Sequence, residues 1–167
     1  MIGKIFTAGS IMVLAFVGTA FAQTPTRLNQ FDAWGAYSYK SGNNTVCYVL
    51  SAPLTSQPTN VNHGDNFFLI SKRAGGQVIF EPQFMAGYTL KSGSKVTVTV
   101  DGKNYEFFTK DSSAWASSQS AENQLVAAMR AGSNLTVKAV SQRGTNTSYT
   151  YSLKGVTAAL NSTQNCK

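Results

Sequence analysis

The sequence predicts a mainly β fold, a compact antiparallel β-sandwich or barrel with one packed α-helix and a short C-terminal helix. The clearest evidence is the segment from Val96 to Val100, where valine alternates with threonine as in a half-buried strand. Asp101-Gly102 follows, a pair that favours the tight turn of a β-hairpin, and aromatic residues continue the alternation on the returning strand. Similar alternation, separated by turn residues, recurs along the chain.

The remaining strands are predicted from the same pattern. They cover residues 31–39, 45–50, 66–72, 77–84, 134–141 and 147–153. Pro82 is expected to interrupt one of them, because proline has no N–H to donate to a β-ladder. The segment from Pro53 to Gly64 is predicted to be a loop, and Ala74-Gly75-Gly76 a hairpin turn.

Two helices are predicted. The first covers residues 120–131: Ser120 caps its first turn, Glu122 suits the positive N-terminal end, and Gly132 ends it. Its apolar stripe consists of Ala121, Leu125, Ala128 and Met129. The second covers Val156–Ser162 and is short enough to depend on packing for its stability. Together with the long loop, the helices are expected to cover the sheet edges.

The N-terminus predicts export. Residues 1–22 have the features of a secretory signal peptide: one lysine, an apolar run, and small residues before a cleavage point between Ala22 and Gln23. An uncleaved membrane anchor is the alternative, but the apolar run is short for a bilayer span. The mature chain is then expected to have a flexible lead over 23–30, a single domain over 31–167, and no transmembrane span.

Cysteine usage fits an oxidising compartment. Cys47 and Cys166 both lie in the predicted mature chain, and a disulfide between them would close a loop of about 120 residues. Two free thiols, or pairing with a partner protein, are the alternatives. No Cys-x-x-Cys pair is present, which argues against thiol redox chemistry as the function.

Composition excludes several classes of protein. Charged residues make up 13% and apolar residues 43%, so the chain is neither a disordered polymer nor a membrane bundle. The 14 Lys+Arg exceed the 7 Asp+Glu, but the cations are scattered, which argues against nucleic acid as a partner. The positive excess favours an anionic envelope or host-surface component as partner, although solubility alone explains it equally well.

The sequence offers little for catalysis. His63 is the single histidine, and Asp65 beside it could orient its imidazole, yet no nucleophile motif accompanies the pair. One histidine and two cysteines are too few for a closed zinc site, and no phosphate-binding glycine loop is present, so no metal and no cofactor are predicted. His63 and Asp65 are therefore assigned to a turn-rich loop, with ligand binding as the functional alternative and catalysis as the least favoured one.

Several short motifs occur together in a characteristic order. They include Phe31-Asp32-Ala33-Trp34, Cys47, His63-Gly64-Asp65, Gly87-Tyr88-Thr89-Leu90, Ser141-Gln142-Arg143-Gly144-Thr145, Tyr151-Ser152-Leu153-Lys154-Gly155 and Cys166. Their order and spacing resemble the invasion-associated locus B family of exported bacterial proteins. The resemblance implies a periplasmic or outer-membrane-associated protein, linked in some intracellular pathogens to invasion of host cells. The family has no agreed catalytic set, so it implies no active residue here.

The leading functional hypothesis is a non-enzymatic envelope protein that binds or stabilises an envelope or host-surface component. The loop Ser51–Asp65 is the predicted binding segment. The alternative is a periplasmic carrier of a lipid or other small ligand, held in the interior or mouth of a β-barrel. The sequence identifies neither the partner nor the oligomeric state.

Overall fold

The computed structural model describes residues 24–73, 79–164 and 166. The predicted signal peptide, its cleavage point and the predicted turn at Ala74-Gly75-Gly76 lie outside these residues. The elements are β1 (Thr26–Phe31), β2 (Trp34–Ser41), β3 (Asn44–Ser51), β4 (Thr55–Gln57), β5 (Phe67–Lys72), β6 (Phe80–Met85), β7 (Lys95–Val100), β8 (Lys103–Lys110), β9 (Ser113–Ala116), α1 (Gln119–Ala131), β10 (Asn134–Val140), β11 (Asn146–Ser152) and α2 (Val156–Gln164). The mainly β prediction is confirmed.

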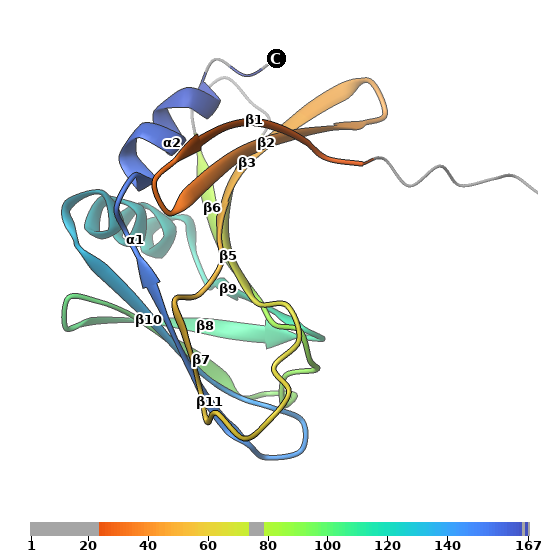
Figure 1. Cartoon of the computed structure of the whole chain (residues 1–167), viewed down its shortest axis with the longest axis vertical. Helices are drawn as coiled ribbons and strands as arrows, with labels where there is room; N and C mark the ends of the chain where they lie inside the picture. The colour runs from red at the N-terminus through yellow and green to blue at the C-terminus, as the bar shows by residue number, and fades with distance from the viewer. Residues whose placement is uncertain (1–23, 74–78, 165, 167) are drawn as a thin grey trace, which may run out of the picture.

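The strands of the described chain form one antiparallel sheet of 11 strands, in the order β1-β2-β3-β5-β6-β9-β8-β7-β10-β11-β4. This sheet bends back on itself, so that strands distant in the order meet across a common core. Phe68 of β5 contacts Tyr151 of β11 with ring centroids 6.0 Å apart, and Phe84 of β6 contacts Tyr149 of β11 at 5.5 Å. The arrangement is therefore sandwich-like (Figure 1).

The core is filled by large side chains. Those fully buried include Trp34, Phe68, Phe84, Phe107, Tyr149 and Tyr151. Both helices add to the same cluster, α1 mainly through Leu125 and Met129 and α2 through Leu160. The described core is filled by these side chains. Packed protein interiors leave little room for a ligand, whereas a carrier would need a cavity.

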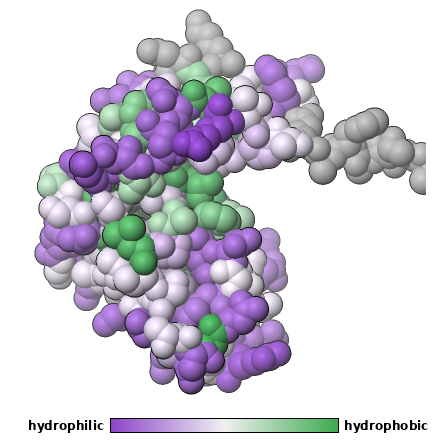
Figure 2. Space-filling model, in the orientation of Figure 1, coloured by the Kyte–Doolittle hydropathy of each residue, from purple (hydrophilic) through white to green (hydrophobic). Residues whose placement is uncertain are grey.

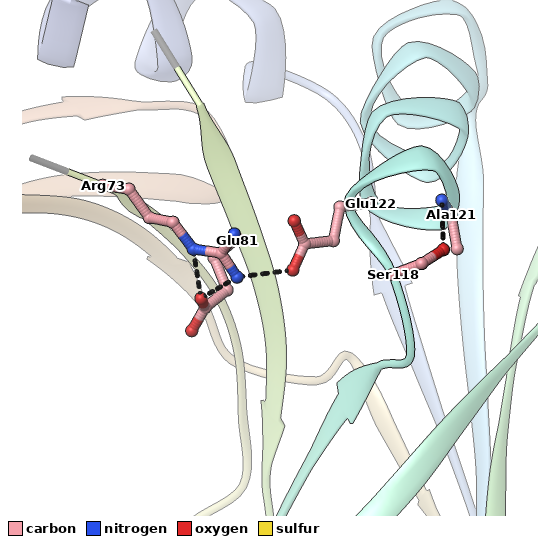
Figure 3. A network of polar contacts seen from close by, with 5 residues as sticks. All are labelled: Arg73, Glu81, Ser118, Ala121 and Glu122. Atoms are coloured by element: carbon pink, nitrogen blue, oxygen red, sulfur yellow. Dashed lines mark hydrogen bonds and ion pairs between the residues drawn. The ribbon is translucent and has the colours of Figure 1, made fainter. Parts of the chain in front are cut away.

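Helix α1 begins earlier than predicted. Its cap is Ser118, whose hydroxyl accepts a hydrogen bond from the backbone N–H of Ala121 at 3.2 Å (Figure 3), so the assignment of Ser120 as cap was wrong. Strand β9 ends at Ala116, and the backbone is still extended at Ser118, so this residue can cap the helix that follows. Gly132 ends the helix with φ −91°, where a Cβ atom would lie 2.7 Å from Val100. Helix α2 forms as predicted, extended to Gln164.

The N-terminal lead differs from prediction. From Thr26 onward the segment predicted as a flexible lead forms β1, which pairs with β2 in antiparallel register. Before Phe31 its side chains are exposed and Leu28 is the only apolar one, so it lacks the apolar alternation by which strands are found in a sequence. The carbonyl of Phe31 also packs against Gly155, where a Cβ atom would lie 2.0 Å away.

Two short strands were missed, and one predicted break does not occur. Thr55–Gln57, inside the predicted loop, forms β4 and covers the outer edge of β11. Ser113–Ala116 forms β9 after a turn at Asp111, which has φ +54°. Strand β6 runs through Pro82, and β9 pairs with it only from Gln83 onward, so no hydrogen bond of that ladder needs the missing N–H.

The disulfide forms between Cys47 and Cys166, with a Cα–Cα distance of 6.2 Å and a sequence separation of 119. It ties the end of the chain beyond α2 to β3, so the last helix is held against the first hairpin. Among the described residues, no helix is both long enough and apolar enough to cross a membrane.

Candidate functional site

The outward side of the sheet carries an unusual number of apolar side chains. Alternate residues of β2, β3, β5, β6, β9 and β8 point away from the core, because their neighbours in sequence are buried in it. We call this surface the aromatic face; it comprises Tyr37, Tyr48, Leu50, Phe67, Leu69, Met85, Phe108 and Trp115. Antiparallel sheets usually present polar residues on the side opposite the core, so this composition calls for an explanation.

Strand register aligns the centre of the aromatic face. Leu50 lies opposite Leu69, Leu69 opposite Gln83, Gln83 opposite Trp115, and Trp115 opposite Phe108. These residues form one row that crosses five neighbouring strands. Cross-strand neighbours lie close enough for their side chains to touch, so the row is a continuous surface.

Stacked rings stabilise the two ends of the aromatic face. Tyr37 and Tyr48 stack with centroids 5.4 Å apart, and Phe108 and Trp115 at 5.9 Å. The Tyr37 ring also lies over Gly35, where a Cβ atom would come within 2.6 Å of it. Phe108 is nonetheless 50% exposed to solvent. The rings are therefore ordered without being buried.

No helix of the described chain covers the aromatic face. The buried residues of α1 and α2 belong to the core cluster on the opposite side of the sheet. Figure 2 shows hydrophobic residues gathered in a hollow beside the region where Figure 1 places β3, β5 and β6. In this view the hollow is open to solvent and lies beside strands that contribute to the aromatic face.

Lysines border the aromatic face on the β8 side. Lys95 lies opposite Phe108, and Lys110 lies opposite Ser113, which in turn neighbours Met85. Lys95 also forms an ion pair with Glu106 on the adjacent strand. Lys110 adds a positive charge at this edge that none of the ion pairs among the described residues balances.

His63 lies elsewhere, in a hydrogen-bonded network below the loop that follows β4. Its Nε2 donates to the carbonyl oxygen of Pro58 at 2.8 Å, and its Nδ1 lies 2.8 Å from the hydroxyl of Tyr149. The hydroxyl of Tyr149 also lies 3.1 Å from the hydroxyl of Tyr88, which in turn contacts the hydroxyl of Thr147 at 2.6 Å. Burial, together with the Tyr88 contact, raises the pKa of Tyr149 far above its ordinary value, so its hydroxyl stays protonated.

This network holds His63 within the protein. Both of its ring nitrogens have protein partners, the Tyr149 hydroxyl and the Pro58 carbonyl. Asp65 is exposed and forms no hydrogen bond with His63 in the part of the chain that the structure describes. The His–Asp pair considered from the sequence is not assembled.

A cleft of about 480 Å³ opens beside this network. Its walls come from Val61–Gly64, Gly87–Thr89 and the turn between β10 and β11, which includes Arg143. The first two walls touch through backbone: a Cβ atom on Gly87 would lie 2.5 Å from the carbonyl oxygen of His63. Asp65 does not line the cleft, so the structure brings only one of the two predicted loop residues to it.

The remaining carboxylates of interest belong to a structural ion-pair network (Figure 3). Arg73 pairs with Glu81 on β6 and, at 2.8 Å, with Glu122 in the first turn of α1. Glu122 is only 2% exposed, and burial raises its pKa while Arg73 opposes the rise. The three side chains bind the helix start to the sheet. Among the described residues, no group of three His, Cys, Asp or Glu side chains could hold a metal ion.

The family model for invasion associated locus B (IalB) protein matches residues 34–164, from the start of β2 to the end of α2. This chain belongs to the IalB family. Its fold is similar to that in the crystal structure of invasion associated protein B from Bartonella henselae, with a TM-score of 0.55 at 15% sequence identity, covering 80% of this chain and 93% of that one. No curated protein matches the chain. The resemblance read from the short motifs is confirmed, and the IalB fold is the one described above.

Sequence reasoning missed both surfaces in part. Aromatic residues on strands usually lie in the core, but Phe67-Phe68-Leu69-Ile70 is continuously apolar, a signal that both sides of that strand are apolar. The cleft could not be anticipated, because Arg143 and Tyr88 meet His63 only through the folding of distant segments.

Proposed function

We propose that this IalB family member is a non-enzymatic exported protein of the periplasm or outer membrane that binds another envelope or host-surface protein through the aromatic face. The observation that carries the proposal is the row through Leu69, Gln83, Trp115 and Phe108, apolar except for Gln83, which no helix among the described residues covers. Large exposed apolar patches on soluble proteins mark interaction sites, because leaving them in water forgoes the free energy of their burial.

The shape and charge of the aromatic face indicate what kind of partner it binds. The hollow beside β3, β5 and β6 fits a protruding protein element, such as an amphipathic helix or a loop, better than it fits a flat bilayer. Lys95 and Lys110 at its border favour acidic side chains flanking the partner's apolar residues. A second copy of this chain is a poorer occupant, since the full sequence carries a formal charge of +7 and two copies repel.

Export is supported by three features together. The N-terminal residues have the pattern of a secretory signal, the chain forms a disulfide, and the family is named for association with invasion. In this proposal the protein contributes to host-cell invasion only through the partner protein that it binds.

Site-specific photocrosslinking in living cells tests the proposal. A benzophenone amino acid placed at Leu69 or Phe108 is expected to give one discrete crosslinked product with a different protein. The matched control is Thr136, which lies on the same outward side of the sheet but in its threonine-rich part. Three results would count against the proposal: no product from either position, an equal product from Thr136, or a product of twice the chain's own mass.

The alternative of an interior lipid carrier has no specific observation in its favour. The described interior is occupied by Phe68, Phe84 and Phe107, which are essentially inaccessible to solvent. The cleft beside His63 opens at the surface and does not reach into that interior core; most residues that line it carry polar side chains.

A further inference from the structure

We infer that the cleft beside His63 is a second, independent binding site that takes a sugar-like ligand carrying one carboxylate. The site shares no residue with the aromatic face, so the inference does not depend on the proposed partner. A cavity of about 480 Å³ lies within the range of small-molecule sites and accommodates one or two sugar rings.

The charge of the residues that line the cleft favours an anionic ligand. Arg143 is the one lysine or arginine among the residues lining the cleft, and no Asp or Glu lines it. Within the described chain, Arg143 takes part in none of the ion pairs, which involve Arg73, Lys95 and Lys154. A free guanidinium presents parallel N–H donors that match a carboxylate, and a single positive charge balances a single negative one. A carboxylate therefore fits better than a doubly charged phosphate.

The neutral polar side chains of the cleft favour a ligand that carries hydroxyl groups. Gln142, Thr89 and Thr145 line the cleft, and their side chains form no hydrogen bond to the rest of the described chain. Amides and hydroxyls both donate and accept, as the hydroxyls of a sugar do. The ring of Tyr88, half-buried in the wall, offers an apolar surface to the face of a sugar ring.

The walls are held in place before any ligand arrives. The backbone N–H of Gln142 donates to the carbonyl of Thr89 at 2.9 Å, and Leu90 and Ser141 form an isolated β-bridge. The network of Tyr88, Tyr149 and His63 fixes the opposite side. A preformed site does not lose affinity to the ordering of its own loops on binding.

Titration of the purified full-length mature protein tests the inference. Galacturonate is the carboxylate probe, galactose the neutral control and galactose 1-phosphate the dianion control, with binding followed by calorimetry and by amide NMR shifts. We expect saturable binding of galacturonate with shifts confined to residues 61–64, 87–89 and 141–147. Arg143→Gln should weaken it about tenfold or more. Lys40→Gln, which removes one positive charge at the distant β2–β3 hairpin, should leave it unchanged.

Several results would overturn the inference. They are absence of saturation by galacturonate at tens of millimolar, equal binding of galactose, tighter binding of galactose 1-phosphate, or equal losses in Arg143→Gln and Lys40→Gln. Thermal unfolding of both variants should match the parent, because Arg143 is exposed and its turn is held by backbone bonds. A loss of binding with unchanged unfolding would thus be attributable to the lost guanidinium.

Discussion

The guanidinium of Arg73 lies 2.8 Å from the carboxylate of Glu122, whose side chain is almost wholly buried at the start of α1. The same guanidinium also pairs with Glu81, so one cation joins the sheet to the helix (Figure 3). The second oxygen of Glu122 has no hydrogen-bond partner in the described chain. This carboxylate therefore depends on Arg73 for its charge to be tolerated.

Replacing Arg73 by methionine should destabilise the protein by about 1–3 kcal/mol, because it leaves a buried carboxylate without its partner. The free energy of unfolding in urea is the measurement. Lys103→Met, on an exposed hairpin, is the matched control and should change it by less than about 0.5 kcal/mol. Equal effects of the two substitutions would show that the ion pair contributes nothing specific.

Glu122 also predicts a pH dependence. Its folded-state pKa is raised above the unfolded value, so the folded chain takes up this proton at a higher pH than the unfolded chain does. The resulting contribution to stability is fully present below the ordinary carboxyl pKa and is lost as pH rises through the raised one. Relative to Glu122→Gln, the wild type should thus gain stability as pH falls from neutrality toward the ordinary carboxyl pKa. A difference independent of pH across that range would contradict the prediction.

The disulfide should carry a large share of the stability. Cys47 and Cys166 are separated by 119 residues, and cross-links that close long loops restrict the unfolded chain most. The double variant Cys47→Ala/Cys166→Ala should lose about 2–5 kcal/mol of unfolding free energy. Addition of a reductant to the wild type should reproduce this loss and leave the double variant unaffected. An unchanged midpoint in both cases would contradict it.

His63 should be structural. His63→Phe removes the partner of the Tyr149 hydroxyl and should cost about 1–3 kcal/mol of stability. Crosslinking from Phe108 should persist in this variant at a temperature where it remains folded. If His63→Phe abolished a cellular phenotype while retaining wild-type stability and crosslinking, a chemical role for the imidazole would have to be reconsidered.

The contact between Gly64 and Gly87 should be intolerant of a side chain. In Gly87→Ala the new methyl group would lie 2.5 Å from backbone atoms of His63 and Asp65, which forces the two walls of the cleft apart. Gly93→Ala is the control: it has φ +71° but open space around it, so it should cost only about 1 kcal/mol of backbone strain. Galacturonate binding should fall in Gly87→Ala and be retained in Gly93→Ala.

Local patterns allowed much of the fold to be predicted. The hairpin at Asp101-Gly102 was found because the turn needs two residues with positive φ, and the structure gives them +43° and +91°. Both helices were found from apolar spacing and end signals. The polar β1 and the short strands β4 and β9 were missed, since each is defined by pairing with a distant or adjacent strand and not by its own composition.

The functional surfaces were harder to predict for the same reason. An aromatic residue on a strand is usually in the core, and only strand register reveals that Trp115 and Phe108 lie on the other side. His63 was singled out from the sequence, but the partner of its ring is Tyr149, far along the chain, and not the neighbouring Asp65.

Hydroxyl-radical footprinting of Met85 tests the central claim most directly. Met85, in the aromatic face, is 37% exposed, whereas Met129 is buried at 0% and Leu54, outside that face, is 65% exposed. The account predicts that oxidation of Met85, normalised to Leu54, is several-fold slower in intact cells than in the purified protein, while Met129 stays unreactive in both. Equal normalised oxidation of Met85 in cells and in purified protein would contradict a partner bound at the aromatic face.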